Sequence, residues 1–151
     1  MITIVAVGKK HEEWVKAGVE RYEKRLKQPF SVRWILLPHS SFEGLAARQE
    51  ESERIRKKLN DEDYVILLDE RGVQVSSDQL SHDLQNLFAW GRRVVLVIGG
   101  AYGVTDELHR RADFVLSLSK LVLPHQLVRL VIIEQLYRAQ QIAGGGKYHH
   151  Q

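Results

Sequence analysis

The chain has 151 residues, with 22 lysine and arginine side chains against 19 aspartate and glutamate side chains, and it contains no cysteine. This length and a near-average composition predict one globular domain over residues 1–151 and exclude a disordered or fibrous chain. The lack of cysteine excludes disulfides and thiol chemistry. Because no apolar run reaches the ~20 residues of a membrane span, we expect a cytoplasmic protein without membrane contact.

Basic residues concentrate towards both ends of the chain. Residues 1–60 carry 13 basic and 8 acidic side chains, residues 61–113 carry 5 and 10, and residues 114–151 carry 4 and 1. Two basic ends that fold onto one face would attract phosphate groups. The alternative interpretation is that lysine and arginine simply solvate surface helices.

The first 60 residues are typical of two strand and helix pairs. The apolar run Ile2–Val7 predicts a strand, and apolar residues at three- and four-residue spacing predict a helix over residues 14–26. A second strand is predicted over Ser31–Leu37. A helix follows over about residues 41–59, and on its outer face we expect two ion pairs, Glu50 with Arg54 and Glu53 with Lys57.

The middle of the chain repeats this alternation. Tyr64–Leu68 is apolar throughout, which predicts a strand buried on both faces and ended by residues 69–72. Ser76 and Gln79 stand at the spacing of a capping box and predict the start of the next helix. Val94–Ile98, the most apolar strand, leads directly into the sequence GGAYG.

The last third contains one short and one long helix. Thr105 is a predicted N-cap for a helix that ends near Arg111, and a fifth strand is expected over residues 114–117. After the loop 118–123, a helix is predicted from Pro124 to about residue 143. Strands and helices that alternate in this way predict an α/β fold, a mostly parallel sheet with helices on both faces.

Two segments combine unusual composition with a position at a strand end. Gly99–Gly103 follows an apolar strand, and its small residues let backbone N–H groups approach a ligand, although a tight turn is the simpler interpretation. The loop 118–123 is rich in leucine and valine, whereas exposed loops are normally polar. Either a neighbouring element covers this loop, or it forms an apolar pocket for a flat ring such as adenine.

The last helix and the tail offer further candidates. Because the helix is apolar almost all round, it needs a second partner, and a symmetric dimer is the simplest one. Glu134 and Arg138 are four residues apart, so an ordinary ion pair is the alternative to a functional role for Arg138. The tail contains Tyr148, His149 and His150, but no third ligand at a recognisable spacing, which disfavours a metal site.

Four of these segments together resemble a known family. IGGAYG, LSLSKLVLPHQLVR, EQLYRA and the terminal KYHHQ, in this order, resemble the ribosomal RNA large subunit methyltransferase H family, a branch of the SPOUT methyltransferases. The resemblance covers the whole chain. It implies a homodimer with a C-terminal trefoil knot that transfers a methyl group from S-adenosyl-L-methionine, without a metal. The implied target is N3 of pseudouridine 1915 in 23S ribosomal RNA on the assembled ribosome, and DNA is not a partner.

The resemblance also implies functional residues. Arg138 would hold a phosphate or the developing negative oxygen, Tyr148 would orient the target base, and His149 would remove the N3 proton. The residues implied to line the methyl-donor pocket are Leu68, Gly99, Leu118, Ser119, Lys120, Leu121, Val122 and Leu123. Two alternatives remain open, a ribosome-binding factor without activity and a SPOUT methyltransferase that acts on another RNA site.

Overall fold

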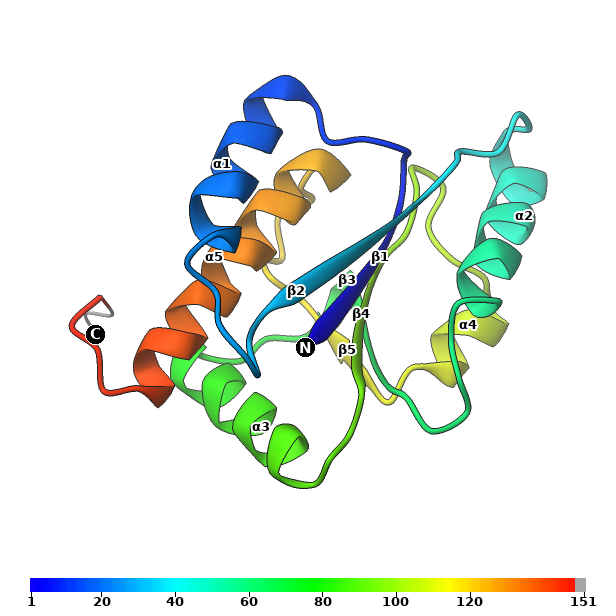
Figure 1. Cartoon of the computed structure of the whole chain (residues 1–151). Coiled ribbons are helices and arrows are strands. Elements are labelled where there is room, and N and C mark those ends of the chain that lie inside the picture. The colour runs from blue at the N-terminus through cyan, green and yellow to red at the C-terminus, as the bar shows by residue number, and fades with distance from the viewer. Residues whose placement is uncertain (149–151) are drawn as a thin grey trace.

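The chain forms one five-stranded sheet between two layers of helices (Figure 1). The computed structural model describes residues 1–148. All strand pairs are parallel, in the order β2-β1-β4-β3-β5, which confirms the predicted α/β fold with a mostly parallel sheet. The strands are β1 (Ile2–Val7), β2 (Val32–Leu37), β3 (Tyr64–Val73), β4 (Val94–Ile98) and β5 (Phe114–Leu116).

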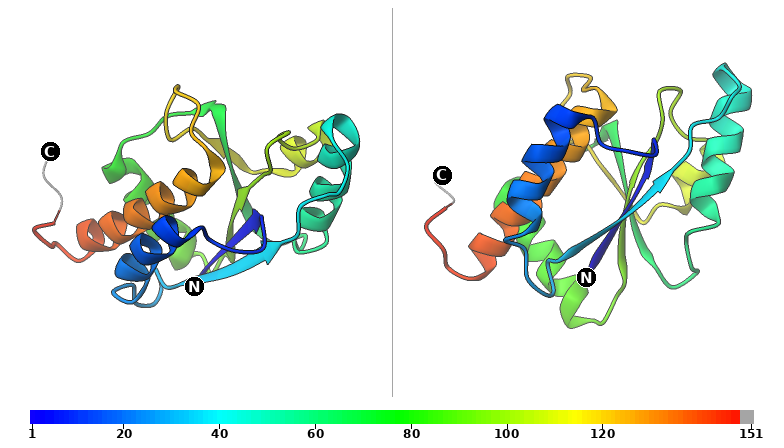
Figure 2. Two further views of the ribbon diagram at one scale, coloured as in Figure 1. Left: turned by 90° about the horizontal axis from the view of Figure 1, so that it is seen from above. Right: turned by 45° about the horizontal axis from the view of Figure 1, so that its top comes forward.

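Helices cover both faces of the sheet, as the turned views make clear (Figure 2). The helices α1 (Glu13–Glu23), α3 (Ser77–Ala89) and α5 (His125–Ala143) lie on one face, and α2 (Gly44–Arg56) and α4 (Asp106–Arg111) lie on the other. Side chains alternate between the two faces along a strand. Accordingly, Ile2, Ile4 and Ala6 of β1 belong to the core under α1, α3 and α5, whereas Val5 and Val7 belong to the core under α2.

The end of the third strand differs from the prediction. Residues 69–72 were expected to end it, but β3 continues to Val73, which pairs with Leu116 of β5 after a register shift. The Ser117 backbone N–H also donates to the Val73 carbonyl, at 2.9 Å. The polar residues that suggested a turn are therefore held in the strand by a neighbour that is distant in sequence.

Helix α2 is shorter than predicted and carries one different ion pair. It begins at Gly44, because the backbone before it turns where the Phe42 N–H donates to Ser40 Oγ at 3.0 Å. The ion pair between Glu50 and Arg54 is confirmed. The expected partner of Glu53 was wrong, since Glu53 pairs with Arg56 one turn away and not with Lys57.

Helix α5 is covered mainly within its own chain. It packs against both α1 and α3, and four of its buried apolar residues face the core under these helices: Ile132, Ile133, Leu136 and Ala139. Much of the apolar surface that suggested a second subunit is thus buried inside one chain. Neither α5 nor any other helix among residues 1–148 is long and apolar enough to cross a membrane. The trefoil knot stays a prediction.

The N-cap of α3 gives a simple stability prediction. Ser76 Oγ accepts a hydrogen bond from the Gln79 backbone N–H at 3.0 Å, as the capping spacing predicted. We expect the Ser76→Ala substitution to lower the free energy of unfolding by about 1 kcal/mol, because one helix-terminal N–H loses its acceptor. Urea denaturation measures this change. An unchanged denaturation midpoint would contradict the capping role.

Candidate functional site

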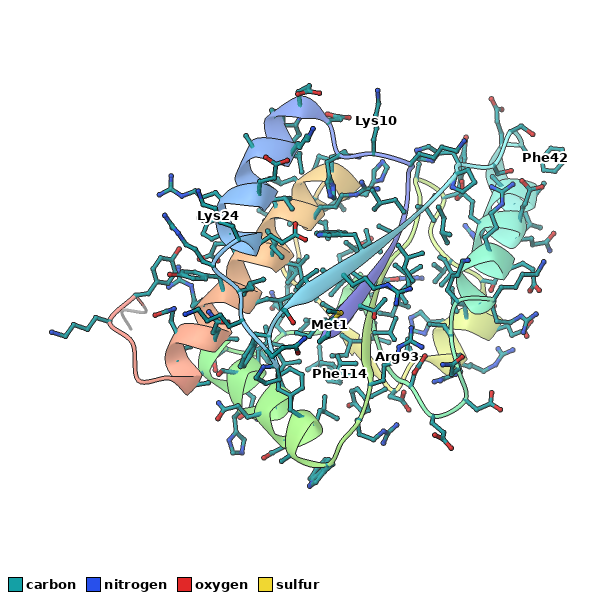
Figure 3. All side chains as sticks on the ribbon, viewed as in Figure 1. Met1, Lys10, Lys24, Phe42, Arg93 and Phe114 are labelled. Atoms are coloured by element: carbon teal, nitrogen blue, oxygen red, sulfur yellow. The ribbon has the colours of Figure 1, made fainter. Side chains whose placement is uncertain are left out.

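A cavity of about 140 Å³ lies beside residues 67–70 of β3 and the ends of β4 and β5. The carboxyl ends of parallel strands meet at one edge of a sheet, and this is where α/β folds usually bind ligands. Figure 3 shows Lys10 and Phe42, which follow β1 and β2, towards the same edge, whereas Arg93 and Phe114 lie at the opposite edge. The cavity is lined by these three strands, the glycine turn, the loop after β5 and the start of α5.

Most of the residues implied as donor-binding line this cavity. Six of the eight do so: Leu68, Gly99, Leu118, Ser119, Leu121 and Leu123. Lys120 and Val122 belong to the same loop but do not line the cavity. The loop is fixed by its own serines, since Ser117 Oγ donates to the Ser119 carbonyl and the Leu121 N–H donates to Ser119 Oγ, each at 2.9 Å. The two segments singled out for composition therefore meet at one site.

Three polar residues in the cavity wall were not predicted there. Asp69 and Glu70 follow the apolar part of β3, and His125 begins α5. A hydrogen bond from Arg71 holds the pKa of Asp69 below its usual value, so this carboxylate is charged at neutral pH. Burial and the charge of Arg129 lower the pKa of His125, so its ring is neutral. The signal for the two acids was their place directly after a buried strand, where the sequence predicted only the end of that strand.

The glycine turn has room for little except glycine. A Cβ atom at Gly99 would lie 2.8 Å from Val104 Cγ1, and one at Gly100 would collide with the carboxylate of Glu51. Gly103 has a φ of +76°, a left-handed conformation that favours glycine. Backbone groups of the turn are therefore exposed to the cavity without intervening side chains.

Helix α2 holds this turn through three of its residues. Arg48 Nε donates to the Tyr102 carbonyl at 2.8 Å, and the Thr105 N–H donates to Ser52 Oγ at 3.0 Å. Glu51, between these two anchors in sequence, lies against Gly100. Three residues on one side of α2 thus fix the position of the turn.

The end of β1 is held by a fully buried arginine. Arg129 of α5 donates to the carbonyls of Lys10, Val7 and Gly8 at 3.0, 2.9 and 3.0 Å. Burial lowers the pKa of Arg129 from its usual value. Gln126, one turn earlier, accepts from the Glu12 N–H at 3.0 Å. The start of α5 is therefore bound to the loop after β1 as well as to the cavity.

The candidate catalytic residues lie at the other end of α5. Arg138 forms an ion pair with Glu134 and stacks over the ring of Tyr148, with 4.9 Å from its guanidinium carbon to the ring centroid. The ring of Tyr148 also meets that of Tyr137 edge-on, at 4.9 Å between centroids. His149, the candidate base, lies outside the described residues. The structure thus brings Arg138 and Tyr148 together, and the ion pair expected as the simpler interpretation is also present.

Within one chain, these residues do not reach the cavity. His125 lines the cavity and Arg138 lies 13 residues further along the same helix, which at 1.5 Å per residue separates their backbones by about 20 Å. The views of Figure 2 show the last turn of α5 at the edge of the molecule, next to the C-terminal tail and away from the first turn. The two parts of the predicted site are therefore apart in a single chain.

The surroundings of Tyr148 predict that its hydroxyl loses its proton at a higher pH than that of an ordinary tyrosine. Burial, a hydrogen bond with Tyr22 and the charge of Glu134 raise the pKa of Tyr148 to about 12. Its neutral form is favoured by the fold, so the associated stability is present below pH ~10 and is lost as the pH rises towards 12. In an ultraviolet absorbance titration, the difference between the wild type and Tyr148→Phe should appear only above pH ~11. A difference centred near pH 10 would contradict this contact.

The described part of the chain holds no group of three histidine, cysteine, aspartate or glutamate side chains placed to bind a metal ion. The cavity wall instead combines apolar side chains, bare backbone and two carboxylates. Such a lining suits an organic ligand with a flat ring and a few polar groups.

The chain is similar to known methyltransferases in sequence and in fold. A family model described as "Predicted SPOUT methyltransferase" matches residues 1–149. A protein named ribosomal RNA large subunit methyltransferase H from Acetivibrio thermocellus is 40% identical, over 98% of both chains. Proteins of the same name from Bacillus cytotoxicus and Shouchella clausii are 40% and 37% identical, again over 98% of both chains. A probable methylase family protein from Haemophilus influenzae has the same fold, with a TM-score of 0.54, 14% identity, and coverage of 99% of this chain and 70% of the other.

Proposed function

This chain belongs to the SPOUT methyltransferase family, and we propose that it methylates N3 of pseudouridine 1915 in 23S ribosomal RNA, with S-adenosyl-L-methionine as the donor. The name of its relatives, ribosomal RNA large subunit methyltransferase H, supports the class of RNA. The observation that carries the proposal is that the glycine turn and the apolar loop after β5 line one cavity. We propose the assembled ribosome in the cytoplasm as the place of action.

The cavity wall fits the proposed donor. Apolar side chains of the loop, with Leu118 and Leu121 among them, can enclose adenine, while backbone groups of the glycine turn remain free to hydrogen-bond its edge. Asp69 and Glu70 suit ribose hydroxyls and a positively charged ligand. In this proposal Lys120 and Val122 border the donor from the same loop. The bound donor supplies a sulfonium, which is already an activated electrophile.

The protein must therefore align the two reactants and remove a proton. We propose His149 as the acceptor of the N3 proton, directly or through water. Arg138 would hold a phosphate or the oxygen on which negative charge develops, and Tyr148 would orient the base. The contact between the Arg138 guanidinium and the Tyr148 ring supports a joint role for these two residues.

A homodimer completes the site in this proposal. The distance of about 20 Å along α5 separates Arg138 from the cavity of its own chain. A second copy of the chain would bring its tail to the cavity of the first. A groove between α1 and α5 supports such pairing, because half-buried apolar residues line it, among them Leu127, Leu130 and Val131.

Recognition of the RNA would depend on the ribosome as well as on the protein. A formal charge of +3 for each chain is modest for tight binding of naked RNA. We therefore expect intact ribosomes to be methylated far better than a short RNA hairpin of the same sequence. Equal methylation of the two substrates would contradict this expectation.

Mass spectrometry of ribosomal RNA tests the proposed function. In cells that lack the protein, the fragment containing pseudouridine 1915 should lose 14 Da, the mass of one methyl group in place of one hydrogen, and a plasmid-borne copy should restore it. Loss of a methyl group at another position would favour a SPOUT methyltransferase of another site. Unchanged RNA, together with no binding of S-adenosylmethionine in calorimetry, would favour a ribosome-binding factor without activity.

A further inference from the structure

A cluster of charged and polar side chains lies beside the cavity, at the carboxyl ends of β1 and β4. It consists of His39, Glu51, His125 and Arg129, and we refer to it as the polar cluster. His39 Nδ1 lies 3.8 Å from Glu51 Oε2, and the rings of His39 and His125 meet nearly at right angles with 6.0 Å between centroids. Arg129 and His39 both lie beside Gly8. A Cβ atom at Gly8 would lie 2.7 Å from Arg129 Nη2 and 3.3 Å from His39 Nε2.

The polar cluster holds most of the buried polar atoms without a hydrogen-bond partner. Among residues 1–148 there are five such side-chain atoms, and three of them belong to the cluster: Glu51 Oε1, His125 Nδ1 and Arg129 Nε. Glu51 is only 3% exposed and Arg129 is fully buried. Buried polar groups are nearly always paired, so three unpaired atoms at one place call for an explanation.

The unpaired atoms of Glu51 and Arg129 need hydrogen-bond partners of opposite kinds. Glu51 Oε1 is an acceptor, and Arg129 Nε is a donor. Glu51 Oε2 already accepts from the Ser40 N–H at 2.9 Å, and the terminal nitrogens of Arg129 are bonded to backbone carbonyls. A ligand with a single charge would satisfy only one side of the cluster. The end of an α-amino acid carries both an ammonium and a carboxylate, and it would satisfy both.

The polar cluster adjoins the cavity through one shared residue, His125, and through Gly100, which lies between the cavity and Glu51. His125 and Gly100 line the cavity, and the carboxylate of Glu51 lies against Gly100 where any side chain would collide with it. The cavity measures about 140 Å³, whereas pockets for ligands of the donor's size usually measure roughly 300–1,000 Å³. Part of a bound donor must therefore extend beyond the cavity, and the polar cluster lies at its border.

We propose that the polar cluster binds the α-amino acid end of the methyl donor while the adenosine occupies the cavity. Glu51 Oε1 accepts from the α-ammonium, and His125 Nδ1 and Arg129 Nε donate to the α-carboxylate. This inference rests on the proposed function, because it takes S-adenosylmethionine as the ligand. The alternative is that the cluster only anchors α2 to the glycine turn.

Calorimetry with two analogues separates these possibilities. S-adenosylhomocysteine retains the amino acid end, whereas 5′-methylthioadenosine lacks it. The Glu51→Gln variant keeps the acceptor for the Ser40 N–H but removes the charge, so it should bind S-adenosylhomocysteine roughly 10- to 100-fold more weakly than the wild type. Its affinity for 5′-methylthioadenosine should stay within about twofold. The matched control Glu53→Gln removes an exposed carboxylate of the same helix and should alter neither affinity.

The results distinguish an amino acid subsite from a purely structural role of the polar cluster. If Glu51→Gln weakens both ligands equally, or neither, the amino acid subsite is wrong and the anchoring role is favoured. If the wild type binds neither ligand, the proposed donor itself is wrong. Should the variant not fold, imidazole NMR signals of the wild type give the answer. S-adenosylhomocysteine should shift the signals of His39 and His125, whereas 5′-methylthioadenosine should leave those of His39 unchanged, and identical shifts from the two ligands would overturn the subsite.

Discussion

Replacing Arg129 with methionine is expected to lower the free energy of unfolding by roughly 3–5 kcal/mol. The arginine is fully buried and donates to three backbone carbonyls, that of Val7 at the end of β1 and those of Gly8 and Lys10 in the loop after it. Methionine fills similar space but leaves these carbonyls without a donor, and each buried unsatisfied group costs about 1–3 kcal/mol. The end of β1 and the start of α5 would lose the hydrogen bonds that join them.

Urea denaturation of the two proteins measures this loss. Arg110→Met is the matched control, because Arg110 is exposed on α4 and the same chemical change there should cost less than about 0.5 kcal/mol. A similar loss for both variants would point to the charge of the chain and not to the buried carbonyls. A loss below about 1 kcal/mol for Arg129→Met would show that the loop after β1 finds other hydrogen-bond donors.

Mixing two inactive variants is expected to restore about a quarter of the wild-type methylation rate, if the tail of one subunit serves the cavity of the other. The Leu121→Lys variant places a cation in the cavity wall and should bind the positively charged donor poorly. His149→Ala should lower the rate roughly 10²- to 10⁴-fold with unchanged donor affinity, as removal of a base does. Each variant alone is therefore nearly inactive.

A mixed dimer has one cavity and one tail that are both intact. If the tail acts on the partner's cavity, these two parts meet in one of the two sites, and half of all dimers are mixed after random exchange. Methylation of ribosomes by the co-expressed variants measures the recovery, and co-expression of His149→Ala with Tyr148→Ala is the control that should remain inactive. No recovery in the first mixture would show that each chain uses its own tail. Normal turnover of His149→Ala alone would refute the proposed base.

Local sequence patterns predicted the order of the elements and their caps because these features depend on neighbours in the chain. Ser76 and Thr105 each accept a hydrogen bond from the backbone three residues ahead, as expected from spacing. The length of β3 was not predictable in this way. Its end at Val73 depends on pairing with Leu116, which the polar sequence between Asp69 and Gly72 does not reveal.

The site was predicted to a similar extent. The glycine turn and the loop after β5 stood out by composition, and the resemblance indicated which of their residues line the pocket. His125 lies at the predicted start of a helix, and nothing in the sequence relates it to His39 or Glu51. These three residues meet because β1, β2 and β4 end side by side, which only the order of strands in the sheet determines.

The position of β5 and α5 after the other strands in the sequence has a consequence for synthesis. A nascent chain that ends at Ile98 contains four of the five strands but neither the loop after β5 nor the helix that supplies Arg129. The carboxyl end of β1 cannot form its hydrogen bond with Arg129 until that helix has been translated. Donor binding should therefore arise in a single late step, and prematurely terminated chains should have no partial activity. An enzyme proposed to modify ribosomes would gain its function only after a ribosome has translated its helix α5.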